Sequence, residues 1–422
     1  MKPSRIFDIL SIQVETHPIE KCLNDKRNGN WKSISTQKYF ESVNFISTAL
    51  IEMGVKPQDK IALISTTNRS EWCIMDMAIL QIGAISVPLY PNISSKDYEY
   101  ILNHSESVFC FVSDQQVFDK IFSIKSQVRG LLEIFAFDQI KGCKNWSELI
   151  EVGKEAWNEK KLVEIKSNIE SDHIATIIYT SGTTGRSKGA MLTHRNLQSN
   201  AEALVNCWQF IDKDILIHAL PLYHTHGLFV ATNVSLLAGS SMFLMKKFDA
   251  DAICRRMPQA NVLMGVPTFY VRLLEHPDLE NAAKKMRLFV SGSAPMLAHT
   301  HALWKERTGQ AILERYGMTE TSMNTSNPYL GERRAGTAGL PLPGVEVIVT
   351  DPATGKVLQD GRTGMIEIRG PNVFKGYWGM PEKTAEELRE NGFFITGDLG
   401  TIGEDGYVSL VGRSKDLIIS GG

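Results

Sequence analysis

The 422-residue chain lacks three features that would narrow its class. Its six cysteines are scattered, with no two at the short spacing of a metal cluster or disulfide framework, so we expect a reducing, cytoplasmic compartment. No apolar run reaches the length of a membrane span, and no signal-peptide core follows the first residues. The net charge of −2 gives no reason to expect nucleic acid or an anionic membrane as a partner.

Buried strands alternate with amphipathic helices along most of the chain, a pattern that predicts an α/β fold with helices on both faces of parallel sheets. Predicted strands cover residues 60–65, 84–89, 108–112, 215–220, 241–245, 262–266 and 287–290. Predicted helices cover residues 70–82, 196–207, 249–257, 268–275 and 296–308. From about residue 335 the segments become short, β-branched and bounded by Gly, Pro and Asp, which predicts antiparallel strands at 345–350, 364–369 and 407–411.

A loop rich in hydroxyls and glycines follows the apolar segment 176–179. It contains Thr180, Ser181, Gly182, Thr183, Thr184, Gly185, Lys188 and Gly189. Glycines let backbone N–H groups approach an anion, hydroxyls donate hydrogen bonds to it, and a lysine adds positive charge. The loop is not the common P-loop, because Lys188 is preceded by Ser187 and followed by Gly189. We interpret it as a polyphosphate-binding loop.

Two later segments have the composition of a nucleotide site. The first follows a predicted strand and consists of Ser291, Gly292, Ser293, Ala294 and Pro295, small residues that leave room for a flat ring. The second consists of Glu314, Arg315, Tyr316, Gly317, Met318, Thr319 and Glu320. There, Tyr316 offers an aromatic face to a purine, Thr319 offers a hydroxyl to a phosphate, and Glu320 is a candidate Mg²⁺ ligand. Taken alone, either segment could be an ordinary turn.

Three other residues complete the candidate site. Asp398, in Thr396-Gly397-Asp398, can accept both hydroxyls of a ribose, and Arg413 can reach ribose or phosphate with its fork of donors. His224 and His226 stand between a predicted strand and an apolar segment. Because no Cys, Asp or Glu lies nearby at ligand spacing, His224 is better interpreted as a substrate-pocket wall than as a metal ligand.

Together these motifs resemble the adenylate-forming superfamily of acyl-CoA synthetases, peptide-synthetase adenylation domains and luciferases. Residues 313–329, 331–336 and 341–344 are similar to malonyl-CoA and methylmalonyl-CoA synthetases, whereas residues 70–72 and 83–91 are similar to long-chain fatty-acyl-CoA ligases. Residues 1–170 hold 16 Lys and 4 Arg, but residues 171–422 hold 11 Lys and 14 Arg, so we hypothesise a chimera joined near residue 170.

The resemblance implies a fold with two doubly wound sheets and a small β-barrel-like subdomain. It divides an N-terminal domain, 1–412, into subdomains 1–170, 171–335 and 336–412, followed by a hinge stub, 413–422, that contains Lys415. A C-terminal domain of about a hundred residues, carrying a catalytic lysine and much of the CoA face, is expected to follow. Without it we expect a poorly active chain that still binds ATP and acid.

The resemblance also implies a reaction in two steps: a carboxylic acid attacks the α-phosphorus of ATP, and the thiol of CoA then displaces AMP. Thr180, Lys188, His224, Thr319 and Glu320 are the implied catalytic residues. The adenine lies against the 291–295 turn and Tyr316, and the ribose against Asp398 and Arg413. For a dicarboxylate substrate, the candidate contacts are Arg287, then Arg186, His224 and Met323. The alternatives are a medium- or long-chain fatty-acyl-CoA ligase, a nucleotide-binding module without turnover and, less favoured, a peptide-synthetase adenylation domain.

Overall fold

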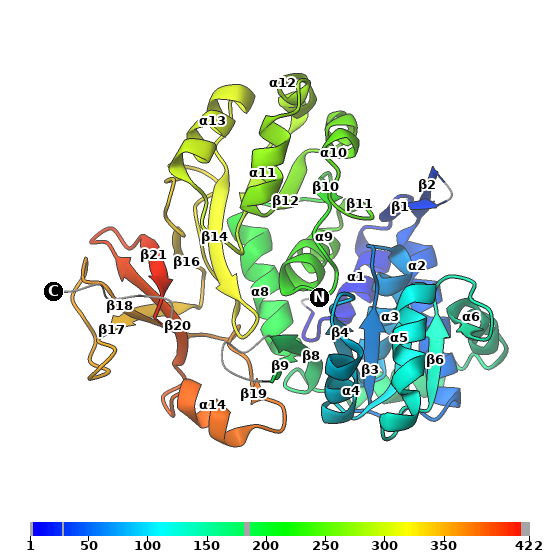
Figure 1. Ribbon diagram of the computed structural model, residues 1–422. Helices are drawn as coiled ribbons and strands as arrows, with labels where there is room; N and C mark the ends of the chain where they lie inside the picture. The colour runs from blue at the N-terminus through cyan, green and yellow to red at the C-terminus, as the bar shows by residue number, and fades with distance from the viewer. Residues whose placement is uncertain (1–2, 28, 181–185, 415–422) are drawn as a thin grey trace.

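The computed structural model describes residues 3–27, 29–180 and 186–414, which form three β-sheets and their covering helices (Figure 1). Two large sheets carry most of the chain. The third, smaller sheet stands at one side of the molecule and contains the last described residues. No helix in these described ranges is both long and apolar enough to cross a membrane.

The eight-stranded sheet is parallel except at the β9 and β19 edge. In spatial order its strands are β19 (Gly376–Tyr377), β9 (Lys188–Thr193), β8 (Ile174–Thr180), β4 (Ile85–Leu89), β3 (Lys60–Ile64), β5 (Ser107–Val112), β6 (Glu133–Ala136) and β7 (Lys144–Asn145). The surrounding helices are α1 (Asp8–Thr16), α2 (Thr36–Glu52), α3 (Ser70–Gln81), α4 (Ser95–His104), α5 (Gln115–Ile124), α6 (Trp146–Glu155) and α7 (Glu159–Ser167).

Helices cover both faces of this sheet, which explains why β3 is buried throughout. Ile61 and Leu63 pack into the core that contains α2 and α3, whereas Ala62 and Ile64 pack into the core that contains α4 and α5. Because successive side chains point to opposite faces of a strand, a sheet covered on both sides requires a continuous apolar run. Residues 61–64 have that run, and the prediction of a buried strand at 60–65 is confirmed by β3.

The nine-stranded sheet has a parallel centre and antiparallel edges. In spatial order its strands are β16 (Leu340–Pro341), β15 (Ser322–Ser326), β14 (Leu313–Met318), β13 (Leu288–Ser291), β12 (Val262–Gly265), β10 (Ile215–His218), β11 (Ser241–Leu244), β1 (Leu23–Arg27) and β2 (Asn30–Ile34). Its helices are α8 (His194–Cys207), the π-helix η2 (His226–Thr232), α9 (Asn233–Leu237), α10 (Ala250–Arg256), α11 (Pro267–Leu274), α12 (Leu279–Ala282) and α13 (Ala298–Thr308).

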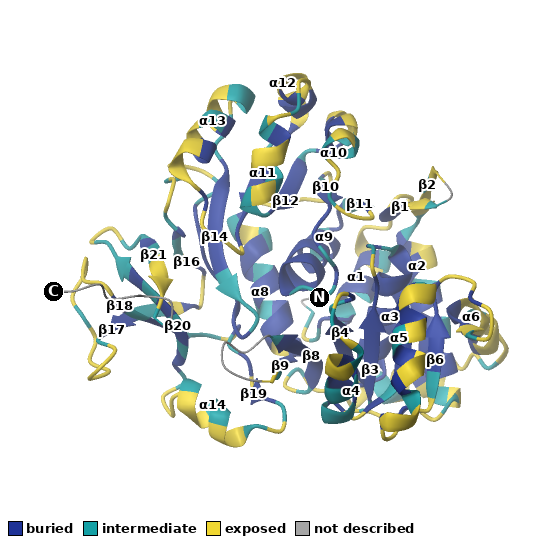
Figure 2. Cartoon of the chain, viewed as in Figure 1, coloured by how far each residue is buried: buried dark blue, intermediate teal, exposed yellow. Residues whose placement is uncertain are grey.

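The α8 and α9 face of this sheet shares one hydrophobic core with the α2 and α3 face of the other sheet. The α10, α11 and α13 face has its own core, in which Trp304 lies edge-on to Tyr270 and Phe289 with ring centroids 4.9 Å apart. Buried residues accordingly run along the strands, and the outer sides of the helices are exposed (Figure 2).

The third sheet is antiparallel, as predicted for the region after residue 335. Its four strands, in order, are β17 (Glu346–Thr350), β18 (Gly364–Arg369), β20 (Phe394–Ile402) and β21 (Val408–Arg413). Helix α14 (Pro381–Glu387) connects it to the eight-stranded sheet, because β19 precedes α14 and pairs with β9 (Figure 1).

The composition of the two large sheets does not change at residue 170, where the predicted subdomain boundary lies. Strand β1 from the first part pairs with β11 of the nine-stranded sheet, and β8 and β9, which follow residue 170, belong to the eight-stranded sheet. Strand pairing joins segments that are distant in sequence, and amino-acid composition carries no information about such pairing. A junction at residue 170 would have to preserve the pairing of β4 with β8.

Candidate active site

The two ends of the phosphate-loop motif lie on adjacent antiparallel strands. Thr180 ends β8 and pairs with Lys188, which begins the antiparallel strand β9. No strand was predicted for residues 188–193, which form β9. Five of the predicted phosphate contacts lie outside the described residues: Ser181, Gly182, Thr183, Thr184 and Gly185.

Lys188 belongs to a cluster with Tyr377, Glu387 and Glu320. Its Nζ lies 3.1 Å from the Tyr377 hydroxyl and 3.3 Å from each carboxylate oxygen of Glu387. The same hydroxyl lies 2.6 Å from Glu387 Oε2 and 3.0 Å from Glu320 Oε1. Burial raises the pKa of Glu320. Burial acts the same way on Glu387, but hydrogen bonds from Tyr377 and Lys383 outweigh it and lower the pKa of that carboxyl.

A second cluster joins the nine-stranded sheet to the small sheet. The Tyr316 hydroxyl on β14 donates to Asp398 Oδ2 on β20 at 2.6 Å, and Arg413 Nε on β21 lies 3.3 Å from Asp398 Oδ1. Asp398 and Arg413 are directly paired across β20 and β21. Burial raises the pKa of Asp398, although Tyr316 and Arg413 both favour its charged form. The structure therefore brings together the three residues predicted to contact adenosine.

The turn from Ser291 to Pro295 follows β13, as predicted, and α13 begins three residues after it, at Ala298. Ser293 has a φ of 67°, a left-handed conformation that a non-glycine residue seldom adopts. Its hydroxyl lies 3.4 Å from His226 Nδ1. Ser291 and Gly292 are buried, whereas Ser293, Ala294 and Pro295 are exposed and form an accessible rim.

Arg315 is a buried cation beside this turn. It is 4% exposed, and all three guanidinium nitrogens lack a hydrogen-bond partner among the described residues. Burial lowers its pKa to about 9, so the group remains mostly charged at neutral pH. A Cβ at Gly292 would stand only 2.5 Å from Arg315 Cζ, so any side chain there would displace the guanidinium.

The pKa of His224 and of His226 is lowered, first by burial and second by the charge of Arg315. His224 Nε2 lies 2.7 Å from the Tyr90 hydroxyl, whereas His226 Nε2 is buried without a partner among the described residues. Arg315 and these imidazoles therefore form a buried polar wall in which the Arg315 nitrogens and His226 Nε2 have no hydrogen-bond partner among the described residues.

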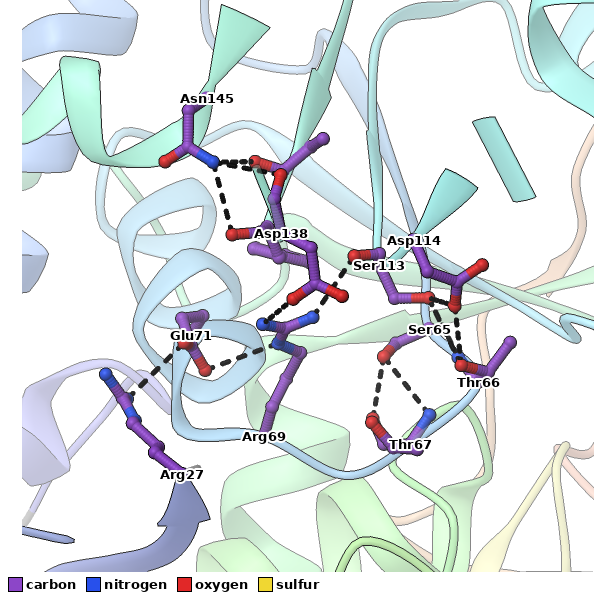
Figure 3. A network of polar contacts seen from close by, with 12 residues as sticks. Arg27, Ser65, Thr66, Thr67, Arg69, Glu71, Ser113, Asp114, Asp138 and Asn145 are labelled. Carbon is purple, nitrogen blue, oxygen red and sulfur yellow. Dashed lines mark hydrogen bonds and ion pairs between the residues drawn. The ribbon is translucent and has the colours of Figure 1, made fainter. Parts of the chain in front are cut away.

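A cavity of 340 Å³ opens beside His224, between the carboxyl ends of strands from both large sheets. Its lining comes from the loops that follow β3, β10 and β11 and from the start of α11. Figure 3 shows the hydrogen bonds that hold the β3 side of this wall. There, Thr66 donates to Asp114 at 2.6 Å, and Arg69 pairs with Asp138 at 2.9 Å and with Glu71 at 3.3 Å. Arg27 on β1 lies 3.4 Å from Glu71, which connects the two sheets at this edge.

Arg287 is not brought to this site. It stands one residue before β13, at the amino end of the strand, whereas the turn lies at the carboxyl end. Its Nε donates to Asp214 Oδ1 at 2.7 Å, and its other nitrogens bind the carbonyl oxygens of Trp208 and Gln209. The expectation that Arg287 lies beside the adenine turn is wrong. A strand places consecutive residues about 3.3 Å apart along its axis, so the length of β13 separates Arg287 from the turn.

The remaining candidates are distributed around the site. Glu314 Oε1 accepts the Gly336 N–H at 3.0 Å. Met323 is buried beneath Gly317, and Arg186 stands 5.0 Å from the ring centroid of Tyr100. Thr319 and Met318 are half-buried at the end of the motif. Lys415 lies outside the described residues.

Sequence reasoning missed three residues of the site: Tyr90, Tyr377 and Glu387. Tyr90 directly follows β4, and a polar residue after a buried strand was a usable signal. Tyr377, on the two-residue strand β19, and Glu387, on α14, gave no signal, since only the pairing of β19 with β9 places them beside Lys188. The Arg272 guanidinium lies 4.6 Å from the ring centroid of Phe248, which lines the cavity.

Comparison with known proteins decides the family. The family model described as "AMP-binding enzyme" matches residues 10–378. The chain belongs to this AMP-binding family. A malonate–CoA ligase of Arabidopsis thaliana is 40% identical over 273 residues, which cover 60% of this chain and 44% of that protein. The mitochondrial malonate–CoA ligase ACSF3 of Xenopus laevis is 33% identical over 84% of this chain and 66% of that protein.

Solved structures of the AMP-binding family confirm the predicted fold class. The apo MatB structure from Rhodopseudomonas palustris superposes with a TM-score of 0.89 at 44% identity, covering 100% of this chain and 81% of that one. The chain thus spans 44% to 66% of the length of the Arabidopsis and Xenopus relatives. The Xenopus match is long enough to include both sides of residue 170, and the chimera stays a hypothesis.

Proposed function

We propose that this protein activates a small dicarboxylic acid, malonate or methylmalonate, as part of an ATP-dependent carboxylate–CoA ligase. In the proposed reaction a carboxylate oxygen attacks the α-phosphorus of ATP, giving an acyl-adenylate and pyrophosphate. The thiol of CoA then attacks the acyl carbon, and AMP leaves. Such transfers depend on positioning and charge neutralisation more than on covalent chemistry by the protein.

The two polar clusters support the nucleotide part of this proposal. Lys188 and Thr180 would contact the outer phosphates, and Thr319 would contact the α-phosphate. Tyr316 and the 291–295 turn would frame the adenine, while Asp398 and Arg413 would hold the ribose, a role supported by the 2.6 Å contact of Asp398 with Tyr316. Thr180, Lys188, His224, Thr319 and Glu320 remain the proposed catalytic residues.

Glu320 would hold Mg²⁺. Its carboxylate is buried, and its Oε1 lies 3.0 Å from the Tyr377 hydroxyl that also contacts Lys188, so a hard oxygen ligand stands close to the first residue of β9. Mg²⁺ is usually bound by one or two carboxylates together with substrate phosphates, and it would supply charge neutralisation on the phosphates.

The observation that carries the choice of acid is Arg315, whose guanidinium is 4% exposed and lacks a hydrogen-bond partner among the described residues. An uncompensated buried charge costs several kcal/mol, so it calls for an anion. The distal carboxylate of a dicarboxylate would satisfy it with a bidentate pair, whereas a fatty acid would leave it unpaired. Arg315 takes the place of Arg287, the leading candidate from the sequence, and Arg272 becomes the second candidate cation because it stacks on the cavity-lining Phe248. Arg186, His224 and Met323 remain weaker candidates for acid contacts.

A pyrophosphate-release assay with malonate, methylmalonate and octanoate tests this assignment. We expect the dicarboxylates to be preferred, and we expect Arg315→Met to lower kcat/KM for malonate by about 10² while affecting octanoate far less. Arg195→Met, which removes an exposed ion pair with Asp172, is the matched control. An equal loss with both acids would contradict the assignment.

A medium- or long-chain acid is the second candidate, because Trp72, Phe248 and Phe269 give the cavity a partly aromatic lining. A preference for octanoate in the same assay would favour it. Binding of ATP without pyrophosphate release from any acid would instead indicate a nucleotide-binding module. Cytoplasmic localisation is also proposed from the scattered cysteines. The Xenopus relative is named mitochondrial, so imaging of the tagged protein decides the compartment.

A further inference from the structure

A hydrogen bond between Tyr90 and His224 joins the two large sheets. Tyr90 directly follows β4 of the eight-stranded sheet, and His224 lies between β10 of the nine-stranded sheet and the π-helix η2. The phenol oxygen lies 2.7 Å from Nε2 of the imidazole. The two rings meet edge to face, with their centroids 5.2 Å apart. The contact therefore engages one ring nitrogen of a residue that also lines the cavity beside it.

Both partners of this contact are held by further contacts. The Tyr90 ring packs against Tyr223 with the centroids 4.9 Å apart, and the Tyr90 carbonyl oxygen accepts the hydroxyl of Tyr98, a buried residue of α4, at 2.7 Å. On the side of His224, the Asn68 amide that follows β3 binds the backbone of residues 220–222, at 2.9 Å as a donor and at 3.1 Å as an acceptor. The phenol and the imidazole therefore meet in a geometry that both sheets fix.

The direction of the hydrogen bond follows from the chemistry of the two groups. A phenol is a much stronger acid than the N–H of a neutral imidazole, and an imidazole nitrogen is a much better acceptor than a phenol oxygen. Burial raises the pKa of Tyr90 to about 12, so the phenol keeps its proton at neutral pH. Burial lowers the pKa of His224, so the imidazole is neutral there and has a lone pair to offer. Tyr90 therefore donates, and Nε2 of His224 accepts.

The contact with Tyr90 also decides what the other ring nitrogen of His224 can do. A neutral imidazole carries one ring N–H, so an Nε2 that accepts leaves the proton on Nδ1. The charge of Arg315 acts on the same ring, since it is the second cause of the lowered pKa of His224. An Nδ1–H donor and the Arg315 guanidinium favour the same kind of ligand atom, an oxygen that carries negative charge.

We propose that Tyr90 is a positioning residue that confines the proton of His224 to Nδ1, so that the imidazole serves the acid as a hydrogen-bond donor and not as a base. The identity of the acceptor rests on the proposed function. In that reaction the reacting group presents an oxygen at each stage: the carboxylate, the carbonyl of the acyl-adenylate and the carbonyl of the thioester. None of these three groups has a proton for a base to remove, whereas each can accept an N–H that stabilises charge on its oxygen.

Long-range proton–nitrogen correlation spectra of the chain with ¹⁵N-labelled histidine test the proposal without ATP, acid or CoA. The couplings between ring nitrogens and carbon-bound protons show which nitrogen is protonated, and His224→Asn identifies the His224 signals among the ten histidines. At pH 8 we expect the Nδ1–H tautomer for His224. Tyr90→Phe keeps the ring and removes only the hydroxyl, so the Nε2–H tautomer should appear. Tyr39→Phe, which removes the buried hydroxyl that donates to the Cys73 carbonyl at 2.9 Å, is the matched control and should leave the tautomer unchanged.

A kinetic measurement tests whether the acid uses this donor. In the pyrophosphate-release assay, Tyr90→Phe should lower kcat/KM for malonate about tenfold, as expected for a weakened hydrogen bond to a charged group, and should change the KM for ATP less than about twofold. A purely structural role of Tyr90 would affect both substrates and the urea midpoint alike, and that result would contradict the use of the donor by the acid.

Three spectroscopic results would overturn the proposal: the Nε2–H tautomer of His224 in the unmodified chain, an unchanged tautomer in Tyr90→Phe, or the same change in Tyr39→Phe. Because the spectra need no turnover, the proposed function and the role of Tyr90 can fail separately. A chain that releases no pyrophosphate with any acid but shows the Tyr90-dependent tautomer would refute the proposed function and support the effect of Tyr90 on His224.

Discussion

The ammonium nitrogen of Lys188 lies 3.3 Å from both carboxylate oxygens of Glu387, so the lysine of the phosphate loop is already paired. Glu387 ends α14, and Tyr377, next to it, also contacts Glu320. A nucleotide that needs both Lys188 and Glu320 must therefore compete with a contact made by the chain itself. Helix α14 would then have two states, one in which Glu387 contacts Lys188 and one in which it does not. The free energies of the two states would differ by the energy of the Lys188–Glu387 ion pair.

Glu387→Gln should tighten Mg·ATP binding about three- to fivefold. The substitution removes the carboxylate that competes for Lys188, and a half-buried pair of this kind contributes at most about 1 kcal/mol. Fluorescence titration with a labelled ATP analogue measures the effect. Glu386→Gln, which removes an exposed partner of Lys383 on the same helix, is the control. Weaker ATP binding in Glu387→Gln would show that Glu387 contributes to the bound state instead.

Asp398→Asn should abolish discrimination between ATP and 2′-deoxy-ATP. The carboxylate can accept both ribose hydroxyls, whereas an amide offers a single acceptor oxygen. We expect the Kd for ATP to rise about tenfold and that for the deoxy analogue to change less. Competition binding with both nucleotides measures this split. Parallel losses for the two would indicate that Asp398 only positions Tyr316 through their 2.6 Å contact.

Arg287→Met should destabilise the fold without altering the choice of acid. The substitution leaves the Asp214 carboxylate, whose side chain is 0% exposed, without its cation. Removing one partner of a buried pair costs about 3 kcal/mol or more. Urea unfolding measures the loss, and the ratio of malonate to octanoate activity should stay constant. A selective loss of malonate activity would restore Arg287 as a substrate contact.

Glu314→Gln should flatten the pH dependence of stability. Burial raises the pKa of Glu314 from 4.5 to about 7, so between these values the folded chain binds the proton more tightly than the unfolded chain. Its contribution to the free energy of unfolding is therefore fully present below pH 4.5 and is lost as pH rises through 7, by about 3 kcal/mol at most. Urea midpoints at pH 5 and pH 8 should converge in the variant, which keeps an acceptor for the Gly336 N–H. An unchanged difference between the midpoints would assign the effect to another group, such as Asp76, whose pKa is also raised by burial to about 7.

Local sequence predicted the elements well because their determinants are local. The strand at 364–369 has the predicted bounds, and α8, α10, α11 and α13 begin or end within two residues of their predicted limits. The errors occur where pairing partners are distant. Strand β9 has half-buried residues at Lys188 and Met191, and its edge pairing with β19, almost 190 residues later in the chain, cannot be read from a local pattern.

The residues of the candidate site show the same difference between what local sequence predicts and what distant contacts decide. Tyr316, Asp398 and Arg413 were identified from residue type and motif, and the structure brings them into contact. Arg287 and Arg315 could not be distinguished by type, since each is an arginine beside a predicted site segment. Their surroundings distinguish them: one stands at the amino end of its strand beside Asp214, and the other is buried at the carboxyl end without a partner among the described residues.

The sequence by itself determined the chemistry that is available: a hydroxyl- and glycine-rich loop that ends in a lysine, a carboxylate after Tyr316, and apolar runs long enough for doubly covered strands. These properties belong to residues and their close neighbours. Only the tertiary structure decided that Glu387 holds Lys188, that Arg315 lies buried beside His224, and that the Tyr90 hydroxyl contacts His224. Each of these relationships depends on which strands pair and which faces pack, and those choices minimise the free energy of the whole chain rather than of any segment.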